Sequence, residues 1–192
     1  STPPRFMSAP VVLVNENDRP LGTIGKLRAH TEGLLHRAFS VFIFDPQGRL
    51  LLQQRAADKY HSGGLWSNTC CSHPHPGESP LEGALRRLPE ELGFCADLSP
   101  VLQETYHLPV GDNLTEHEHT HVFVGTAAAP EIDAAATEVA DWRWRTPDAL
   151  QRELQRYPER YTSWFRHLLP LVLTAPPGHS LSPPHRRQEE AG

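Results

Sequence analysis

The sequence predicts an α+β fold in which a mixed β-sheet is sandwiched between helices, an α/β/α sandwich. Two observations carry this prediction. Strand-like runs and helical segments follow one another without the regular strand–helix–strand alternation of a doubly wound sheet. A strong capping signal at Ser79 marks one helix near the middle of the chain. A length of 192 residues suits a single domain and leaves little room for a second one.

Short strands dominate the first part of the chain. Val11–Val14 is an apolar run that ends in a polar turn over residues 15–20. Runs at residues 38–44 and 50–54 are joined by Asp45-Pro-Gln-Gly48, which is typical of a hairpin. Residues 65–71 form a further, shorter strand candidate.

A helix is predicted from Ser79 to Gly93. Ser79 can cap its first turn, Pro80 suits the first helical position, and Glu82 completes a capping box. Gly93 is a stop signal, and Pro89 removes one helical hydrogen bond, so we expect a kink there. The remaining elements are strands at residues 101–108, 116–126 and 139–144, and helices at residues 147–157 and 161–173.

Composition narrows the class of protein. The formal net charge of -5 argues against a basic nucleic-acid surface, and no apolar run reaches the roughly 18–20 residues that span a bilayer. No secretory signal is evident at the start of the sequence. Three cysteines do not form a disulfide framework, so we expect a cytoplasmic protein. Ser- and Pro-rich ends predict a flexible arm at residues 1–10, one domain at 11–174 and a disordered tail at 175–192.

The segment Glu116-His-Glu-His-Thr-His121 contains a first candidate site. In a strand, Glu116, Glu118 and Thr120 share one face, and the three histidines share the other. Two neighbouring carboxylates repel each other unless a cation or a shared proton holds them together. A solvated edge strand with ordinary polar side chains explains the same pattern equally well.

Histidines and cysteines supply further candidates. His30, His36, His73 and His75 would, together with two carboxylates, suit a divalent transition metal, although their spacing alone does not place them together. In the run Asn68-Thr-Cys-Cys-Ser-His-Pro74, a cysteine could be a metal ligand, a nucleophile, a proton donor or a buried small residue. Adjacent side chains diverge on an extended segment, so one of the pair is expected in the core. Cys95 is predicted to be buried.

Isolated basic residues flank the first hairpin. By default Lys26, Arg55 and Lys59 are solvated side chains. Combined with a metal ion they would form a phosphate site.

These motifs together resemble the type 1 isopentenyl diphosphate isomerases of the Nudix superfamily. The resemblance rests on the runs His36-Arg-Ala-Phe-Ser-Val-Phe-Ile-Phe44 and Lys59-Tyr-His-Ser-Gly-Gly-Leu-Trp-Ser-Asn-Thr-Cys-Cys-Ser-His-Pro74. It continues through Gly77-Glu78, Glu90-Glu-Leu-Gly93, the Glu116-x-Glu118 pair and Tyr161-Thr-Ser-Trp-Phe. It therefore covers residues 10 to 173 and implies the Nudix fold.

The resemblance also implies roles for individual residues. Cys71 would be the catalytic cysteine, Glu118 the acid/base opposite it, and Tyr106 a support for proton transfer. A metal ion, manganese, magnesium or zinc, would be held by His30, His36, His73, Glu116 and Glu118. A second ion, magnesium, would lie at Glu91 with the substrate diphosphate. The substrate itself would be contacted by Lys26, Arg55, Lys59, Arg87 and Trp164.

The Nudix box of this chain departs from the superfamily pattern Gly-x5-Glu-x7-Arg-Glu-U-x-Glu-Glu-x-Gly-U, in which U is a bulky aliphatic residue. Ser72 stands at the opening glycine, and Arg87 replaces the glutamate that follows Arg86. The incomplete set of carboxylates argues against a hydrolase of nucleotides or other diphosphates. A non-catalytic metal- or diphosphate-binding module is the other alternative. The expected partner is a small isoprenoid diphosphate, with no nucleic acid and no membrane, and the chain is expected to be a monomer.

Overall fold

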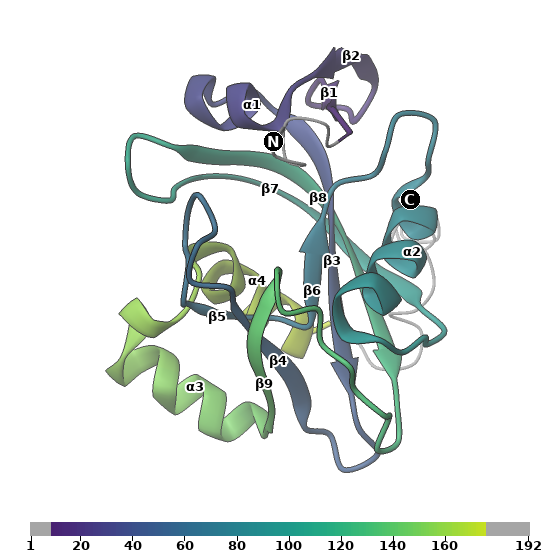
Figure 1. Cartoon of the computed structure of the whole chain (residues 1–192), viewed down its shortest axis with the longest axis vertical. Coiled ribbons are helices and arrows are strands. Elements are labelled where there is room, and N and C mark those ends of the chain that lie inside the picture. Colours follow the sequence, from purple (N-terminus) through teal and green to yellow (C-terminus); the bar gives the residue numbers. More distant parts are fainter. Residues whose placement is uncertain (1–8, 176–192) are drawn as a thin grey trace, which may run out of the picture.

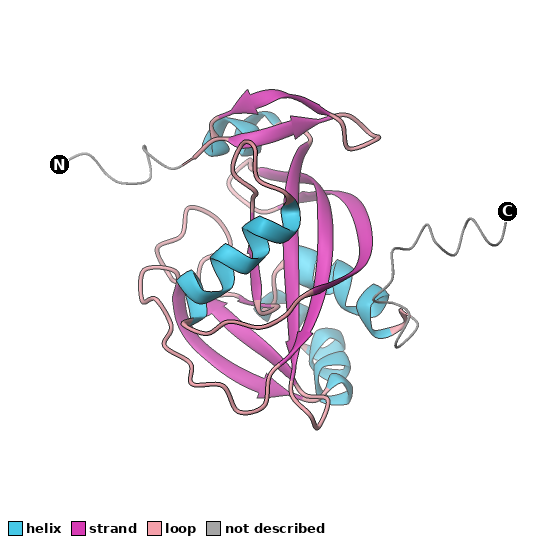
Figure 2. Cartoon of the chain, turned by 90° about the vertical axis from the view of Figure 1, so that its right-hand side faces the viewer, coloured by secondary structure: helices cyan, strands magenta, loops and turns pink. Residues whose placement is uncertain are grey.

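The computed structural model describes residues 9–175 and contains a nine-stranded mixed sheet with helices on both faces (Figure 1). The strands are β1 (Val11–Val14), β2 (Pro20–Ile24), β3 (His36–Phe44), β4 (Leu50–Arg55), β5 (Trp66–Ser67), β6 (Cys70–Ser72), β7 (Ser99–Pro109), β8 (Thr115–Thr126) and β9 (Val139–Arg145). The helices are α1 (Lys26–Glu32), α2 (Pro80–Leu92), α3 (Pro147–Arg156) and α4 (Ser163–Leu173), with a short 3-10 helix at Pro158–Arg160. Figure 2 shows α2 lying across one face of the sheet, with other helices behind the strands. This arrangement confirms the predicted α/β/α sandwich.

Strand β3 lies at the centre of the sheet. It pairs in parallel with β8, in a register that sets His36 beside Glu118. It also pairs antiparallel with β1 and β6, and it meets β4 at the hairpin. Strand β7 pairs antiparallel with β8 and sets Tyr106 beside Glu118. Segments that are distant in sequence are therefore fixed next to one another.

The alternation of side chains along β3 and β8 divides the core into two parts. Phe42 and Val122 pack with α3 and α4 on one face. Phe39 and Phe123 pack with α2 on the other face. Cys70 belongs to the α2 side and Cys71 packs against the α4 side, so the two adjacent cysteines lie on opposite faces of the sheet.

Most predicted elements are confirmed, and the differences have local causes. The strand expected at residues 65–71 is two short strands, because Asn68 turns inward and its amide donates to the carbonyls of Val41 and Cys70. The polar turn at residues 15–20 leads directly into β2, which was not predicted. The last helix begins only at Ser163, because Thr162 caps it. Cys95 is exposed and not buried as expected, because the chain leaves α2 at Gly93.

The predicted arm at residues 1–10 and the tail at 175–192 lie outside the described residues, apart from residues 9, 10 and 175. The division into arm, domain and tail therefore stays a prediction. Within residues 9–175, none of the helices combines the length and the apolar character that crossing a membrane requires.

The predicted capping box of α2 is present. The Ser79 side chain accepts a hydrogen bond from the backbone N–H of Glu82, and the Glu82 carboxylate accepts one from the N–H of Ser79. The helix continues through Pro89 to Leu92. We expect Ser79→Ala to lower the free energy of unfolding by about 1 kcal/mol, because it leaves a donor of the first turn unpaired. Urea unfolding measures this, with Ser79→Thr as the control that keeps the cap. Equal stability of the alanine variant and the wild type would contradict the account.

Candidate active site

A polar pocket opens beside the sheet and is lined by residues of α1, α2, α4, several strands and the irregular segment around residues 59–61. Its walls combine basic, acidic, imidazole and thiol side chains. The lining residues that the sequence predicted are Lys26, His30, Arg55, Lys59, Cys71, His73, Arg87, Glu91, Glu116, Glu118 and Trp164.

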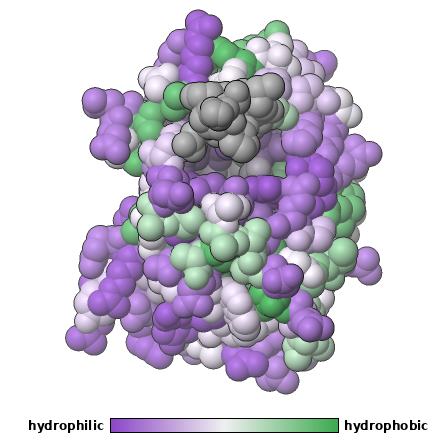
Figure 3. All heavy atoms as spheres, in the orientation of Figure 1, coloured by the Kyte–Doolittle hydropathy of each residue, from purple (hydrophilic) through white to green (hydrophobic). Residues whose placement is uncertain are grey.

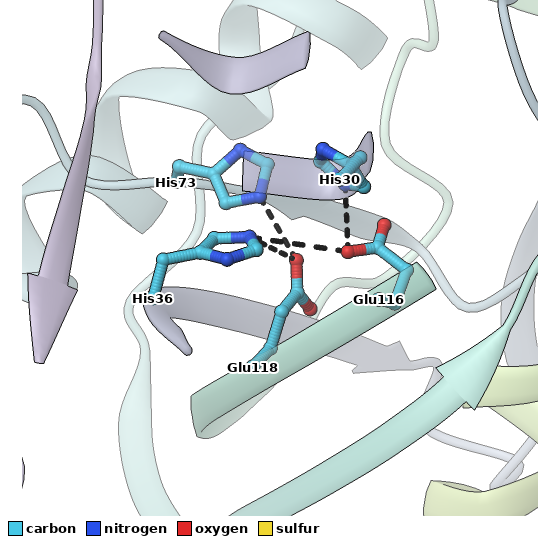
Figure 4. Close-up of side chains that lie close together, drawn as sticks. All are labelled: His30, His36, His73, Glu116 and Glu118. Carbon is cyan, nitrogen blue, oxygen red and sulfur yellow. Dashed lines mark hydrogen bonds and ion pairs between the residues drawn. The ribbon is translucent and has the colours of Figure 1, made fainter. Parts of the chain in front are cut away.

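At one end of the pocket, three histidines and two glutamates converge (Figure 4). One ligand atom from each of His30, His36, His73, Glu116 and Glu118 lies within 4.8 Å of the others. Nε2 of His30 is 2.8 Å from Oε1 of Glu116, and Nε2 of His73 is 2.9 Å from Oε2 of Glu118. The two glutamates are buried neighbours on one face of β8, as the alternation predicted.

The hydrogen bonds of the other ring nitrogens orient two of these imidazoles. Nδ1 of His30 lies 2.7 Å from the carbonyl of Lys26, and Nδ1 of His36 lies 2.8 Å from that of Leu34. A carbonyl only accepts, so we assign the proton to Nδ1 in both rings, which turns the Nε2 lone pairs toward the carboxylates. Nε2 of His36 is buried and lies 3.2 Å from Oε2 of Glu118, but it makes no well-directed hydrogen bond with any of the described residues. In the deprotonated rings, an imidazole lone pair repels the carboxylate oxygen that it faces unless a cation lies between them, so the deprotonated donor set fits a divalent metal ion.

The electrostatics of the cluster agree with that interpretation. Burial by itself would raise the pKa of Glu118, but the adjacent imidazoles of His36 and His73 hold this pKa well below its usual range. Burial lowers the pKa of His73 to about 4. At neutral pH His73 is therefore an uncharged imidazole and Glu118 a carboxylate, which are the forms that bind metals.

Cys71 lines the same pocket, whereas Cys70 is fully buried in the α2 side of the core. The Cys71 thiol lies 3.2 Å from Oδ1 of Asn68, to which it donates. Burial raises the pKa of Cys71 to about 12, so at neutral pH the group carries its proton.

Two predicted residues lie behind the pocket wall. Tyr106 is buried, and its hydroxyl donates to Oε1 of Glu118 at 2.6 Å. His36 is likewise buried, with Nε2 at 3.2 Å from Oε2 of Glu118. Both therefore contact Glu118 without lining the open pocket themselves.

Two of the four predicted basic residues of the pocket, Lys59 and Arg87, are paired with carboxylates. Arg87 pairs with Glu91, one helical turn further along α2, at 2.8 Å, and with Glu138 at 3.1 Å. Lys59 also pairs with Glu138. Burial and the neighbouring charge of Lys59 lower the pKa of Lys26. Clustered cations that repel one another are suited to a multiply charged anion.

Sequence reasoning missed several lining residues. His61 places Nε2 3.3 Å from Oε2 of Glu116 and stands edge-on to Trp164, with ring centroids 5.7 Å apart. The Tyr60 hydroxyl lies 3.1 Å from Nδ1 of His30. These two residues and Glu138 belong to irregular segments, where no periodicity marks which side chains face inward. His75, by contrast, is exposed and outside the cluster.

Comparison with known proteins agrees with this fold. The model of the NUDIX domain family matches residues 34–168. A crystal structure of DR0079 from Deinococcus radiodurans superposes with a TM-score of 0.71 and covers 84% of this chain and 98% of its own, at 19% identity. At that identity the likeness concerns the fold alone.

Closer relatives are found among sequences. The isopentenyl-diphosphate Delta-isomerase of Halorhodospira halophila is 49% identical over 161 residues, which cover 83% of this chain and 92% of the relative. That of Serratia proteamaculans is 50% identical over 159 residues, covering 83% and 88%. The chain belongs to the isopentenyl-diphosphate Delta-isomerase family of NUDIX proteins.

Proposed function

We propose that this protein interconverts isopentenyl diphosphate and dimethylallyl diphosphate in isoprenoid biosynthesis. The observation that carries the proposal is one pocket that combines two proton-carrying groups, Cys71 and Glu118, with a cluster of cationic side chains. The choice of substrate rests on the activity for which the similar sequences are named. The side chains of the pocket are suited to proton transfer and to binding a diphosphate.

The reaction adds a proton to one carbon of the substrate and removes a proton from another, through a tertiary carbocation. It therefore needs one group that gives a proton and one that accepts it. In the free pocket Cys71 is a thiol and Glu118 a carboxylate, because of the environments described above. The two roles exchange when the reaction runs in reverse. Tyr106 orients Glu118 through its hydrogen bond.

We assign a metal ion to His30, His36, His73, Glu116 and Glu118, and manganese, magnesium or zinc would fit these ligands. When bound, the ion supplies positive charge that tunes the acidity of Glu118. A magnesium ion would lie at Glu91 together with the substrate diphosphate.

The diphosphate is gripped and not broken in this proposal. Lys26, Arg55, Lys59 and Arg87 would bind its oxygens, with Glu138 holding Lys59 and Arg87 in the free protein. Arg87 occupies the box position where the hydrolase pattern has a glutamate, and its ion pair with Glu91 supports binding over hydrolysis.

Trp164 would lie over the hydrocarbon end of the substrate. It is buried, on a helix of the apolar core, so it both excludes water and offers a ring face to a developing cation. The Arg55 guanidinium lies 5.1 Å from the centre of this ring, which brings the phosphate-binding and hydrocarbon regions together.

Two alternatives make different predictions for isopentenyl diphosphate. A hydrolase would release orthophosphate or pyrophosphate, and a non-catalytic module would bind the compound unchanged. Phosphorus NMR of the purified protein with isopentenyl diphosphate separates them. We expect both phosphorus atoms to stay in an organic diphosphate while the substrate is consumed. Phosphate release as fast as substrate loss would overturn the proposal, and so would tight binding with no conversion.

Metal affinity is expected to fall as the pH drops. Burial lowers the pKa of His30 and His36, but Glu116 and Glu118 outweigh this and raise both pKa values in the free site. Protons therefore begin to compete with the metal above the ordinary imidazole pKa of about 6.5. We expect full metal affinity well above pH 6.5, and below it a loss of about tenfold or more in metal affinity for each pH unit. Calorimetric titration with Mn²⁺ between pH 5.5 and 8 measures the dependence. A flat profile, or activity that survives exhaustive chelation, would contradict the assignment.

We further propose a cytoplasmic monomer that binds neither nucleic acid nor membranes. The net charge of -5 and the three free cysteines support this. On the face seen in Figure 3, polar side chains dominate and apolar ones form only small groups. This face therefore offers no large apolar surface for a second subunit, which supports a monomer. Light scattering at several concentrations tests the oligomeric state.

A further inference from the structure

The proposed reaction leaves the three histidines of β8 without a role. Glu116 and Glu118 face the pocket, so His117, His119 and His121 lie on the opposite face of the strand. Two of these histidines meet Asp18, which belongs to the turn between β1 and β2. Oδ2 of Asp18 is 2.8 Å from Nε2 of His121 and 3.9 Å from Nε2 of His119.

We propose that Asp18, His119 and His121 form a second metal site, which binds a divalent transition metal such as zinc and ties the β1–β2 turn to β8. One ligand atom from each of the three residues lies within 4.8 Å of the other two. We call this cluster the outer site. It is separated from the catalytic cluster by the thickness of the sheet.

The carboxylate of the outer site is oriented in advance. Arg37 donates from Nε to Oδ1 of Asp18 at 2.8 Å and from its guanidinium to the main-chain carbonyl of the same residue. Asp18 has a positive φ of 61°, and its N–H donates to the carbonyl of Asn15. With Oδ1 engaged, Oδ2 is the oxygen that faces the imidazoles, which is how outer hydrogen bonds position metal-binding carboxylates.

The histidines of the outer site are also fixed by the sheet. His119 pairs with Thr105 of β7 and with Arg37 of β3 in the strand registers. Its Nδ1 lies 2.8 Å from the Thr105 hydroxyl, and its Nε2 lies 2.8 Å from Oε1 of Gln103. In the free protein the Nε2–H of His119 donates to the amide oxygen of Gln103, so metal binding at Nε2 requires the tautomer with its proton on Nδ1, which then donates to the Thr105 hydroxyl.

Ligand type decides which ions the outer site would take. Two imidazoles suit zinc, cobalt, nickel or copper, whereas magnesium and calcium prefer oxygen ligands. Arg37 offsets the single negative charge of Asp18, which further weakens a purely electrostatic attraction for magnesium. The side chains of Asp18, His119 and His121 are 20%, 12% and 17% exposed, so an ion can reach them from solvent.

The test separates the outer site from the catalytic cluster. A His73→Asn/Glu116→Gln background disables the catalytic cluster, and Zn²⁺ is titrated into it by calorimetry. Asp18→Asn is added to remove the carboxylate ligand, because asparagine tolerates positive φ and can still accept from Arg37. His117→Asn is the matched control, since it removes an imidazole from the same strand face outside the cluster.

We expect the background to bind one Zn²⁺ per chain, Asp18→Asn to weaken that binding at least tenfold, and His117→Asn to leave it unchanged. Nitrogen-15 NMR of the wild type with Zn²⁺ should show shifts of the imidazole nitrogens of both His119 and His121, which keeps the test available if the background is poorly folded. Absence of these shifts, or zinc binding that Asp18→Asn does not weaken, would overturn the proposal.

Discussion

Replacing Cys71 with alanine is expected to reduce isomerase turnover by about 10²–10⁴-fold, the range typical of losing a positioned proton carrier. Metal binding should be nearly intact, because Cys71 is not one of the five histidine and glutamate residues that form the proposed metal site. Cys71→Ser should recover little, since a hydroxyl is far less acidic than a thiol. Steady-state kinetics with isopentenyl diphosphate and metal analysis of the same samples measure both effects.

Cys70→Ala is the matched control for this prediction. Cys70 is fully buried on the α2 side of the sheet, away from the pocket. Its loss removes only packing, so we expect a cost of about 1 kcal/mol in stability and little change in turnover. An epoxide analogue of the substrate should label Cys71 or Glu118. Equal loss of turnover in the two alanine variants, or labelling of Cys70, would show that the sides have been assigned wrongly.

Glu118→Gln is expected to lower turnover at least as far as Cys71→Ala, because it removes a proton carrier and a proposed metal ligand together. An amide neither exchanges protons at neutral pH nor carries the charge that faces His36 and His73. Mn²⁺ affinity should fall with turnover in the same variant, unlike in Cys71→Ala. Glu104→Gln on the neighbouring strand, where the carboxylate meets His167, is the control and should stay near wild type. Turnover above about a tenth of the wild-type value in Glu118→Gln would contradict the dual role.

The sequence predicted those parts of the fold that local chemistry determines. The capping box at Ser79 and the alternation of Glu116 and Glu118 along a strand are written into neighbouring residues, and both are present. Helix α1 was missed because it has only seven residues and because its N-cap is Gly25, which has no side chain to cap the first turn. Short helices without a cap depend on packing, which a linear pattern does not display.

The candidate site was predictable only in part. His30, His36 and His73 come from α1, β3 and the segment after β6. The pairing of β3 with β8 and β6, and the packing of α1 on β8, bring them to the glutamates. No spacing rule contains that information, so these residues were grouped by the family resemblance alone. Tyr60 and His61 lie inside the motif that carries the resemblance, yet they were missed. They belong to an irregular loop, and tertiary contacts decide which of its side chains face the pocket.

Proton NMR of isopentenyl diphosphate incubated with the purified protein in D₂O detects proton transfer on an intact diphosphate. We expect conversion to dimethylallyl diphosphate, with solvent deuterium in the methyl groups of the product. The same spectrum recorded with Cys71→Ala should show almost no conversion. Unchanged isopentenyl diphosphate with the wild-type, metal-loaded protein, or its consumption without any dimethylallyl product, would contradict the account.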